Sequence, residues 1–549
     1  MTLYEQLAYN AEKYKDNTAL TYFEHKIKYS ELLKKADSFS ALLYEKGIRK
    51  HDSIALMLPN TFELVISLYA ANKIGARVVL INPKTTAEEL AKELKMTGAN
   101  MLIFSTIAKN TVLNLLRDEH FLSLKYIYVD ILKNLPLIFK TFCLKKLMPY
   151  GAIGEIRKNV GDDNISAFSY RTGEVPICSD DSEEAVVIFS GGTSGELKGI
   201  VHTSASLNNS ARSCANVVKH YDKKLSVLAI LPAFHIFGLT VAIHFPIYSG
   251  GECVLVPFFH MNTIAKIVAF RCPNIIPGVP TIFSRILSSK TIKKYESKGK
   301  VDLSNFLWGI CGGDYLSDEL HDEFSAFLKR NNSGGYISMG YGMSECCPIA
   351  VGGPDDTGGC VGNVFMGCAV SINDCVDGSD SGEICVQSDY LMKKYFYEDG
   401  LDKYPELIDG KYVLRTKDIG HMVGDKLYYE YRLRRIIKVS GNTIFAGNIE
   451  NVIESCECVK ECHVVSVEHK LRGYASFAFV VLSEDANKDK AYDVIYKVCK
   501  NELIPYAIPV HIEFVSENEI DRTALDKVAY GILEKKARKV MNRLDKRID

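Results

Sequence analysis

An apolar strand that runs directly into a glycine-rich loop places strong limits on the architecture of this chain. Residues 185–189, Ala-Val-Val-Ile-Phe, are apolar and mostly β-branched, which is typical of a buried strand. The pattern then breaks at once. The loop that follows consists of Ser190, Gly191, Gly192, Thr193, Ser194 and Gly195.

Such a loop has the chemistry of a polyphosphate site. Glycine allows backbone N–H groups to converge on anionic oxygens, the hydroxyls add donors, and Lys198 places a positive charge at the far end of the loop. It is not a Walker loop, because no Gly-Lys-Ser/Thr closes it. The residues alone also allow a flexible surface turn.

Helical and strand patterns alternate from the N-terminus up to this loop. Strands are predicted at 53–58, 77–81 and 101–105, and helices at 30–46 and from 60 to about 74. Thr86 and Glu89 have the spacing of a capping box, which predicts the start of another helix. Repeated strand–helix winding predicts a doubly wound α/β layer with a parallel sheet.

Length and charge narrow the class of protein. A chain of 549 residues is too long for one hydrophobic core, so two or more domains are expected. With 66 basic and 67 acidic side chains, nothing in the charge favours nucleic acid as the main ligand. The 16 cysteines are dispersed and the first residues lack the pattern of a signal peptide, so we expect reduced thiols and a cytoplasmic protein.

Residues 131–150 combine large apolar side chains with four lysines and no acidic residue. This composition allows peripheral contact with a membrane surface, with lysines directed at lipid phosphates. A helix packed on the domain with its lysines in water is the alternative, and Pro136 interrupts the pattern. No apolar run approaches the roughly 18 to 20 residues that cross a bilayer, so a membrane span is not expected.

The full order Ser-Gly-Gly-Thr-Ser-Gly-x-Leu-Lys-Gly at 190–199 resembles the phosphate-binding signature of the adenylate-forming superfamily. This superfamily contains acyl-CoA synthetases, adenylation domains and firefly-type luciferases. The resemblance implies a large N-terminal domain at 1–431, with doubly wound α/β sheets and a small β subdomain. It also implies a small mobile α+β lid at 435–549 and a hinge near 432–435. Short alternating runs within 358–396 are consistent with the β subdomain.

His235 lies in the segment Pro232-Ala-Phe-His-Ile-Phe-Gly238, after a strand predicted at 225–231. A histidine packed in the core is the plain interpretation, but the carboxyl end of such a strand is where α/β sheets bind ligands. The segment is similar to the superfamily element that borders the acid-binding pocket. By this resemblance, an enzyme that takes amino acids would carry an aspartate in this region to hold the α-ammonium group. The segment contains none, which favours an acid without an α-amino group.

Residues 336–345 end in Tyr341-Gly-Met-Ser-Glu345 and resemble the superfamily element Tyr-Gly-x-Thr-Glu. By this resemblance Tyr341 stacks on adenine, the hydroxyl of Ser344 faces the reacting phosphate, and Glu345 holds Mg²⁺. A carboxylate on Mg²⁺ that bridges phosphate oxygens is suited to this chemistry.

Four further site residues are carried over from similar elements. Asp418 would accept both ribose hydroxyls, although Lys417 replaces the usual preceding glycine. Arg432 would contact the ribose, and the stretch from Lys438 to Gly441 would face the pantetheine channel. These last residues would otherwise be interpreted as a basic edge strand.

Lys527 is the match for the lysine that reaches from the small domain to the substrate carboxylate and α-phosphate. Asp526 stands where the family has glycine, and Asp521 where it has proline. A solvated helix face is the alternative interpretation of this lysine-rich region.

Together these segments favour an AMP-forming acyl-CoA synthetase for a hydrophobic, fatty-acid-like acid, with Mg²⁺, ATP and CoA. Catalytic roles would fall to Lys527, Ser344, Glu345, Lys198 and His235. One alternative is transfer to the phosphopantetheine of an acyl carrier protein. Another is a non-catalytic nucleotide- or acyl-binding homologue.

Overall fold

A computed structural model describes most of the chain. The described residues are 1–131, 173–191, 197–219, 221, 224–257, 260–313, 315–375, 380–397, 404–408, 410–432, 436–439, 442–469, 473–484, 486–522 and 528–545. Of the segment 131–150, whose composition allows membrane contact or a packed helix, only Ile131 lies among them. No helix of the described residues is both long and apolar enough to cross a membrane.

The first sheet of the described residues has seven strands, in the order β18-β8-β7-β4-β3-β5-β6. Its strands are β3 (Ser53–Met57), β4 (Arg77–Leu80), β5 (Ala99–Ser105), β6 (Lys125–Val129), β7 (Glu184–Gly191), β8 (Leu197–Thr203) and β18 (Lys394–Tyr397). The strands from β7 to β6 are parallel, as the alternating pattern predicts. Strands β8 and β18 extend the sheet in antiparallel pairing, and sequence analysis had not predicted β8.

Helices cover both faces of this sheet because successive side chains of its strands point to opposite sides. Ile54 and Leu56 of β3 join a core that includes α1 (Leu3–Lys13), α2 (Tyr29–Glu45) and α3 (Phe62–Lys73). Ala55 and Met57 join a second core with α4 (Ala87–Thr97) and α5 (Lys109–Leu115). The predicted capping box of Thr86 and Glu89 begins α4.

The second sheet has fourteen strands among the described residues and is parallel in its middle. Its strands are β1 (Thr18–Tyr22), β2 (His25–Lys28), β9 (Ser226–Ala229), β10 (Glu252–Leu255), β11 (Ile275–Gly278), β12 (Trp308–Gly312), β13 (Tyr336–Met343), β14 (Cys347–Val351), β15 (Cys360–Val364), β16 (Cys368–Asn373), β17 (Gly382–Ser388), β19 (Glu406–Ile408), β20 (Lys411–Val423) and β21 (Lys426–Arg432). The strands at one end of this sheet, in the order β13-β14-β15-β21-β20-β17-β16, are paired in antiparallel fashion. The predicted β subdomain is therefore an antiparallel extension of the large sheet.

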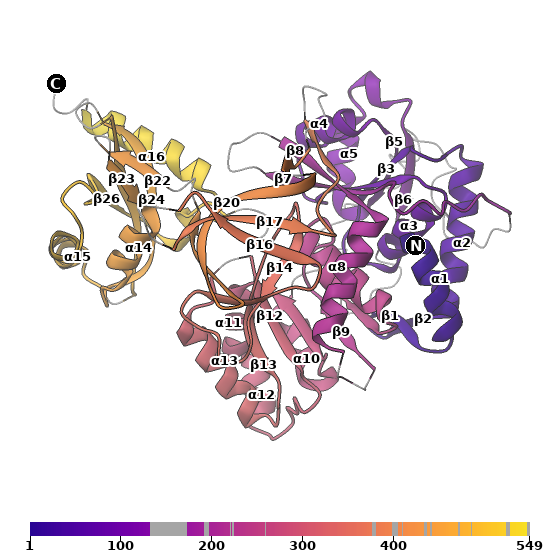
Figure 1. Cartoon of the computed structure of the whole chain (residues 1–549), viewed down its shortest axis with the longest axis horizontal. Helices are drawn as coiled ribbons and strands as arrows, with labels where there is room; N and C mark the ends of the chain where they lie inside the picture. The colour runs from indigo at the N-terminus through magenta and orange to yellow at the C-terminus, as the bar shows by residue number, and fades with distance from the viewer. Residues whose placement is uncertain are drawn as a thin grey trace.

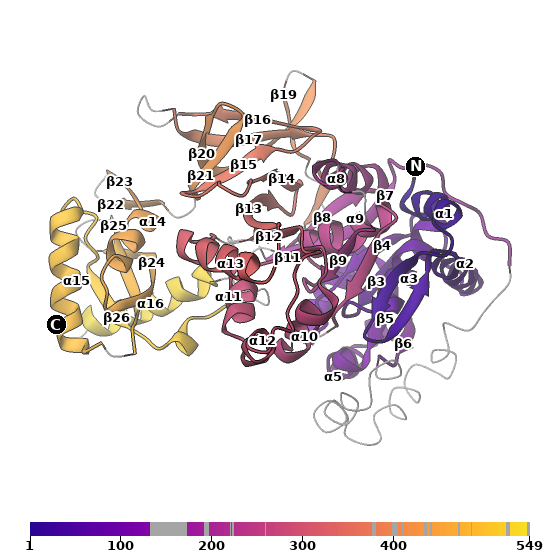
Figure 2. The same ribbon diagram turned by 90° about the horizontal axis from the view of Figure 1, so that it is seen from below.

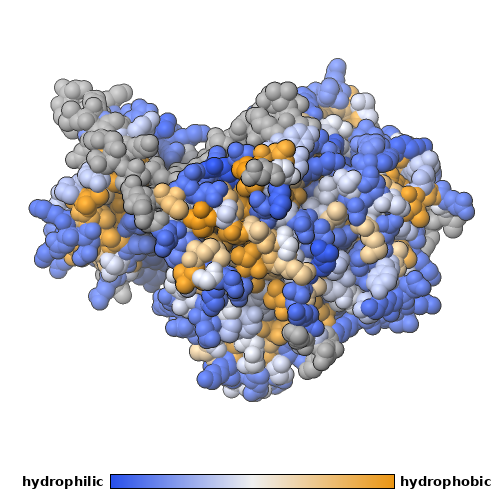
Figure 3. Space-filling model, in the orientation of Figure 1, coloured by the Kyte–Doolittle hydropathy of each residue, from blue (hydrophilic) through white to orange (hydrophobic). Residues whose placement is uncertain are grey.

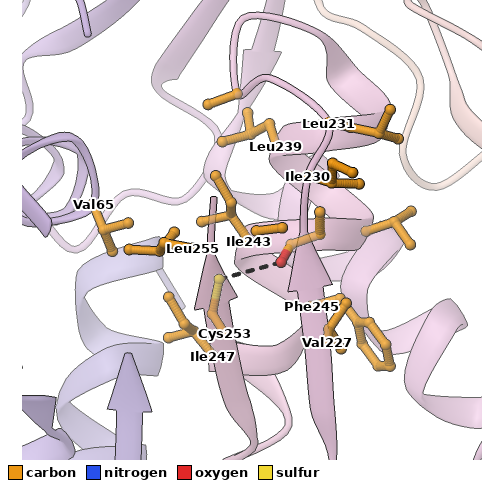
Figure 4. Close-up of a cluster of buried hydrophobic side chains, with 14 of the residues drawn as sticks. Val65, Val227, Ile230, Leu231, Leu239, Ile243, Phe245, Ile247, Cys253 and Leu255 are labelled. Atoms are coloured by element: carbon orange, nitrogen blue, oxygen red, sulfur yellow. Dashed lines mark hydrogen bonds between the residues drawn. The ribbon is translucent and has the colours of Figure 1, made fainter. Parts of the chain in front are cut away.

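Among the described residues, six α-helices and one π-helix pack with the second sheet. They are α8 (Ser204–Val217), α9 (Phe245–Tyr248), α10 (Met261–Arg271), α11 (Pro280–Ser288), α12 (Lys290–Glu296), α13 (Asp318–Arg330) and the π-helix η4 (Gly238–His244). Figure 4 shows side chains from η4, β9 and β10 packed together, with the Cys253 thiol donating to the carbonyl of Ala242 at 3.3 Å. At Gly238 a Cβ atom would lie 2.1 Å from the carbonyl oxygen of Pro232, so this position requires glycine. The close contact fixes the turn that carries His235.

A third sheet, of five strands in the described residues, lies at one end of the molecule with α14, α15 and α16 (Figure 1). Its elements are β22 (Ile436–Val439), β23 (Asn442–Phe445), α14 (Ala446–Glu454), β24 (Val459–His469), β25 (Gly473–Leu482), α15 (Lys488–Glu502), β26 (His511–Phe514) and α16 (Tyr530–Asp545). They enclose two apolar cores of their own. Residues 433–435 of the proposed hinge lie outside the described residues, so the domain boundaries remain a prediction.

The antiparallel end of the large sheet projects from the body beside the third sheet (Figure 2). In Figure 3 apolar surface gathers over the middle of this face, where β16, β17 and β20 lie in Figure 1. Among the exposed apolar side chains of this region are Leu407 on β19 and Tyr412 on β20. The fold thus consists of two covered α/β sheets and a smaller α+β unit, as predicted.

Candidate active site

The two large sheets meet at an ion pair between Lys198 and Glu345. Lys198 lies on β8 of the first sheet, and Glu345 lies in the turn between β13 and β14 of the second. The Lys198 Nζ atom is 3.1 Å from Glu345 Oε1, and both side chains are largely buried. Two residues 147 positions apart in the sequence are thereby placed at one site.

Tyr395 completes this cluster. It lies on β18, which pairs with β8 so that Tyr395 is opposite Ile200. The Tyr395 hydroxyl donates to Glu345 Oε1 at 3.1 Å, and the Lys198 Nζ atom lies 4.3 Å from the centre of the Tyr395 ring. A cation over an aromatic face is held by the quadrupole of the ring. Tyr395 therefore fixes the directions of both charged groups.

His202 supports the turn that carries Glu345. It lies four residues after Lys198 on β8, and its Nε2 atom donates to the carbonyl of Ser344 at 2.8 Å. The side chain is fully buried, and burial lowers the pKa of His202 from 6.5 to about 4. A neutral imidazole with hydrogen on Nε2 suits this contact. The backbone N–H of Met392 holds the carbonyl of Glu345 itself at 2.7 Å.

We expect replacement of His202 by leucine to destabilise the protein by about 1–3 kcal/mol, because the buried carbonyl of Ser344 loses its donor. Replacement by glutamine keeps a donor and should restore most of the activity per folded molecule. Because His202 has a lower pKa in the folded than in the unfolded protein, the unfolded protein binds more protons below pH 6.5. The wild-type free energy of unfolding should therefore fall between pH 6.5 and 4, by up to about 1.4 kcal/mol per pH unit for this histidine.

Denaturant titrations at several pH values measure this slope. His202→Gln should flatten it, and the same change at the exposed His120 should not. Equal slopes in all three proteins would contradict the assignment.

A second polar contact links Tyr341 and Asp418. Tyr341 lies on β13 and Asp418 on β20, and the Tyr341 hydroxyl donates to Asp418 Oδ2 at 2.8 Å. Asp418 is only 4% exposed. Lys417 has φ +61°, a left-handed conformation that glycine adopts at no steric cost, and its N–H donates to Glu383 at 2.9 Å. The lysine thus keeps the backbone shape that a glycine would give.

A mostly apolar cavity opens beside these groups. His235, Tyr341 and Ser344 all line it, together with Leu231, Val241, Ile310, Met343, Cys347 and Val351. Its empty volume, including the open mouth, is about 910 Å³, within the range of small-molecule sites. Polar groups for a reacting centre therefore adjoin an apolar space for the rest of a ligand.

The remaining predicted site residues are only partly described. Ser190 and Gly191 end β7, and Arg432 ends β21 opposite Asp418. Lys438 is in β22. Gly192, Thr193, Ser194, Gly195, Gly441 and Lys527 lie outside the described residues, so their roles remain predictions.

Sequence reasoning missed Tyr395 and His202. Both lie on strands of the first sheet that pair in antiparallel fashion, β18 and β8. The alternation in Lys198-Gly-Ile-Val-His202 was a signal for a strand there. No local pattern indicated that residues 394–397 pair with it.

The residues of the site suit a magnesium ion that is also coordinated by the phosphates of a nucleotide. Among the described residues no group of three or more His, Cys, Asp or Glu side chains is placed to hold a metal by itself. Glu345 offers one carboxylate beside a lysine. Mg²⁺ commonly takes one or two carboxylates and completes its coordination with phosphate oxygens and water. The donor set therefore fits Mg²⁺ bound to a polyphosphate.

Two covered α/β sheets, a smaller α+β unit and a lysine–glutamate site beside an apolar cavity are the features that the resemblance to adenylate-forming enzymes predicts. The comparisons with known proteins give the family. The AMP-binding enzyme family matches residues 7–396, and the C-terminal domain of AMP-binding enzymes matches residues 448–527. The chain belongs to the AMP-binding enzyme family.

Relatives cover nearly the whole chain. It is 28% identical to the long-chain-fatty-acid–CoA ligase of Bacillus subtilis (strain 168), over 96% of this chain and 93% of the relative. It is 27% identical to 4-coumarate–CoA ligase 3 of Arabidopsis thaliana, over 83% and 78% of the two chains. The ATP-bound structure of MatB from Rhodopseudomonas palustris has the same fold, with a TM-score of 0.79, 18% identity and 98% and 100% coverage.

Proposed function

We propose that this enzyme is an acyl-CoA synthetase that activates a hydrophobic, fatty-acid-like carboxylic acid with ATP. The observation that carries the proposal is the apolar cavity whose lining includes Tyr341 and Ser344, next to Lys198 and Glu345. Similarity to a long-chain-fatty-acid–CoA ligase over 96% of the chain supports the same substrate class. We further propose that it acts in the cytoplasm.

In the first half-reaction, an oxygen of the acid's carboxylate attacks the α-phosphorus of ATP and pyrophosphate leaves. Negative charge accumulates on the phosphate oxygens, and the ammonium of Lys198 is placed to stabilise it. Glu345 would hold Mg²⁺, which when bound neutralises phosphate charge. The product is an acyl adenylate.

In the second half-reaction, the thiol of CoA attacks the acyl carbon of the adenylate. A thioester forms and AMP leaves. Rotation of the C-terminal unit between the two steps would bring Lys438 and Gly441 to the pantetheine and keep water from the adenylate.

The direct test measures pyrophosphate exchange into ATP with a panel of acids, followed by AMP formation with CoA or a phosphopantetheine-bearing carrier protein. We expect exchange with alkyl acids and AMP release with CoA. AMP release only with carrier protein would reassign the acceptor. Absence of exchange with every acid would favour a binding protein without catalytic activity.

Lys527 gives a separate prediction. If it contacts the carboxylate and α-phosphate, Lys527→Ala should lower adenylate formation by about 10²-fold or more. Thioester formation from preformed adenylate should change much less. Single-turnover assays of each half-reaction measure the two effects. Equal losses of rate in the two half-reactions would show that Lys527 does not have the assigned role.

A further inference from the structure

Two residues are shared by the lining of the apolar cavity and the lining of a second groove. Val351 and Phe365 line the cavity, and the same two residues line a groove that also includes Asn216, Val217, Tyr336 and Met366. Val351 is 8% and Phe365 6% exposed. The two spaces therefore adjoin at these two largely buried residues, which form the partition between them.

The outer groove reaches the protein surface. Val217 ends α8, and Met366 follows β15; their exposed fractions are 37% and 44%. The Ser213 hydroxyl of α8 donates to the carbonyl of Met366 at 2.5 Å, which holds the two sides of the groove together. Figures 1 and 2 both place α8 alongside β14. A chain that passed between Val351 and Phe365 would thus have an exit.

The lining of both spaces suits an alkyl chain. The described residues that line the groove are uncharged, and the apolar ones among them lie with three polar ones, Ser213, Asn216 and Asn363. The described lining of the cavity contains one histidine, His235, and no Lys, Arg, Asp or Glu. Methylene groups are stabilised when they leave water for an apolar site. The groove would therefore stabilise a chain too long for the cavity.

Of the two residues of the partition, Phe365 has the side chain with the greater torsional freedom. Its backbone N–H donates to the carbonyl of Ile349 at 2.9 Å, and Val351 pairs with Asn363 in the sheet, so the backbone is fixed. Valine has a stiff β-branched side chain, whereas the ring of Phe365 turns about two torsions. Trp308, another wall residue, is held by a hydrogen bond from its Nε1 atom to the hydroxyl of Ser338 at 2.9 Å.

The geometry points to Phe365 as the residue that determines the chain length of the acid. With the ring in place, the cavity ends at Phe365 and accepts chains up to that depth. With the ring turned aside, the cavity joins the groove and the far end of a longer chain reaches the surface. This inference rests on the proposed function, because it assumes that the cavity holds the acid.

The test compares specificity constants for hexadecanoate and octanoate in pyrophosphate exchange. Phe365→Ala should raise the hexadecanoate-to-octanoate ratio about tenfold or more, because several additional methylenes become buried. Val241→Ala is the matched control, since it enlarges the same cavity away from the partition and should change the ratio much less. Adding Asn216→Trp to Phe365→Ala should fill the groove and return the ratio toward that of the wild type.

The possible outcomes distinguish a failure of the role of Phe365 from a failure of the proposed function. An unchanged ratio in Phe365→Ala, or an equal rise in Val241→Ala, would overturn the role of Phe365 while the function stands. If the wild type catalyses pyrophosphate exchange with none of the acids tested, the proposed function fails, and the role of Phe365 fails with it. Thermal melting checks folding, and if Phe365→Ala is unfolded, Phe365→Leu must shift the ratio in the same direction.

Discussion

Replacement of Lys198 by methionine is expected to lower the rate of adenylate formation by about 10²- to 10³-fold, the usual effect of removing one preorganised donor from a charged transition state. The ammonium of Lys198 is fixed at 3.1 Å from Glu345 and over the ring of Tyr395. It therefore needs little reorganisation when negative charge develops on the α-phosphate. Methionine keeps the length and apolar contacts of the side chain but removes the charge.

Pyrophosphate exchange at saturating ATP and acid measures this effect. Lys394→Met is the matched control, because Lys394 also lies in the first sheet and pairs with a carboxylate, Glu184, at 2.9 Å. Both variants lose a largely buried ion pair, so both should melt at lower temperature. Only Lys198→Met should lose exchange activity per folded molecule. Equal rate losses in the two variants would show that Lys198 acts on stability alone.

Replacement of Asp418 by asparagine is expected to raise the KM for ATP by roughly two orders of magnitude. A hydrogen bond to a charged group contributes about 1.5–3 kcal/mol, and the proposed role of Asp418 is to accept two of them from the ribose. Asparagine keeps the shape of the side chain but loses the charge. Asp418 is nearly buried, so water cannot readily replace the lost contacts.

Comparison of ATP with 2′-deoxyATP tests whether the ribose is the partner. The wild type should prefer ATP, and Asp418→Asn should lose most of that preference. Tyr341→Phe is the control, since it removes the hydroxyl that donates to Asp418 at 2.8 Å and keeps the ring. It should retain the preference for ATP. If Asp418→Asn kept the wild-type preference, the ribose contact would lie elsewhere.

Two residues that deviate from the superfamily pattern, Lys417 and Asp526, have to be considered separately. Lys417 stands where glycine is usual, and its positive φ and its hydrogen bond to Glu383 preserve the backbone that presents Asp418. This substitution therefore gives no reason to expect an inactive enzyme. Asp526 lies outside the described residues, so the half-reaction assays of Lys527→Ala are its test.

The sequence alone determined the local elements and the chemistry of the individual segments. Strand–helix alternation predicted the parallel sheet from β3 to β7, and Thr86 with Glu89 predicted the start of α4. These features depend on residues two to four positions apart, whose periodicity is visible in the sequence. The motif around Tyr341 and Glu345 likewise indicated nucleotide chemistry before any geometry was known.

Only the tertiary structure decided which distant segments meet. Tyr395 reaches Glu345 because β18 pairs with β8, and Phe365 lines both the cavity and the groove, where Ser213 of α8 donates to Met366. Tyr395 on β18 pairs with Ile200 on β8, a partner far away in the sequence, and such pairing is selected by the burial of one face of the sheet. No short window of sequence contains that information, so the partners of Glu345 and the lining of the apolar cavity emerged only from the fold.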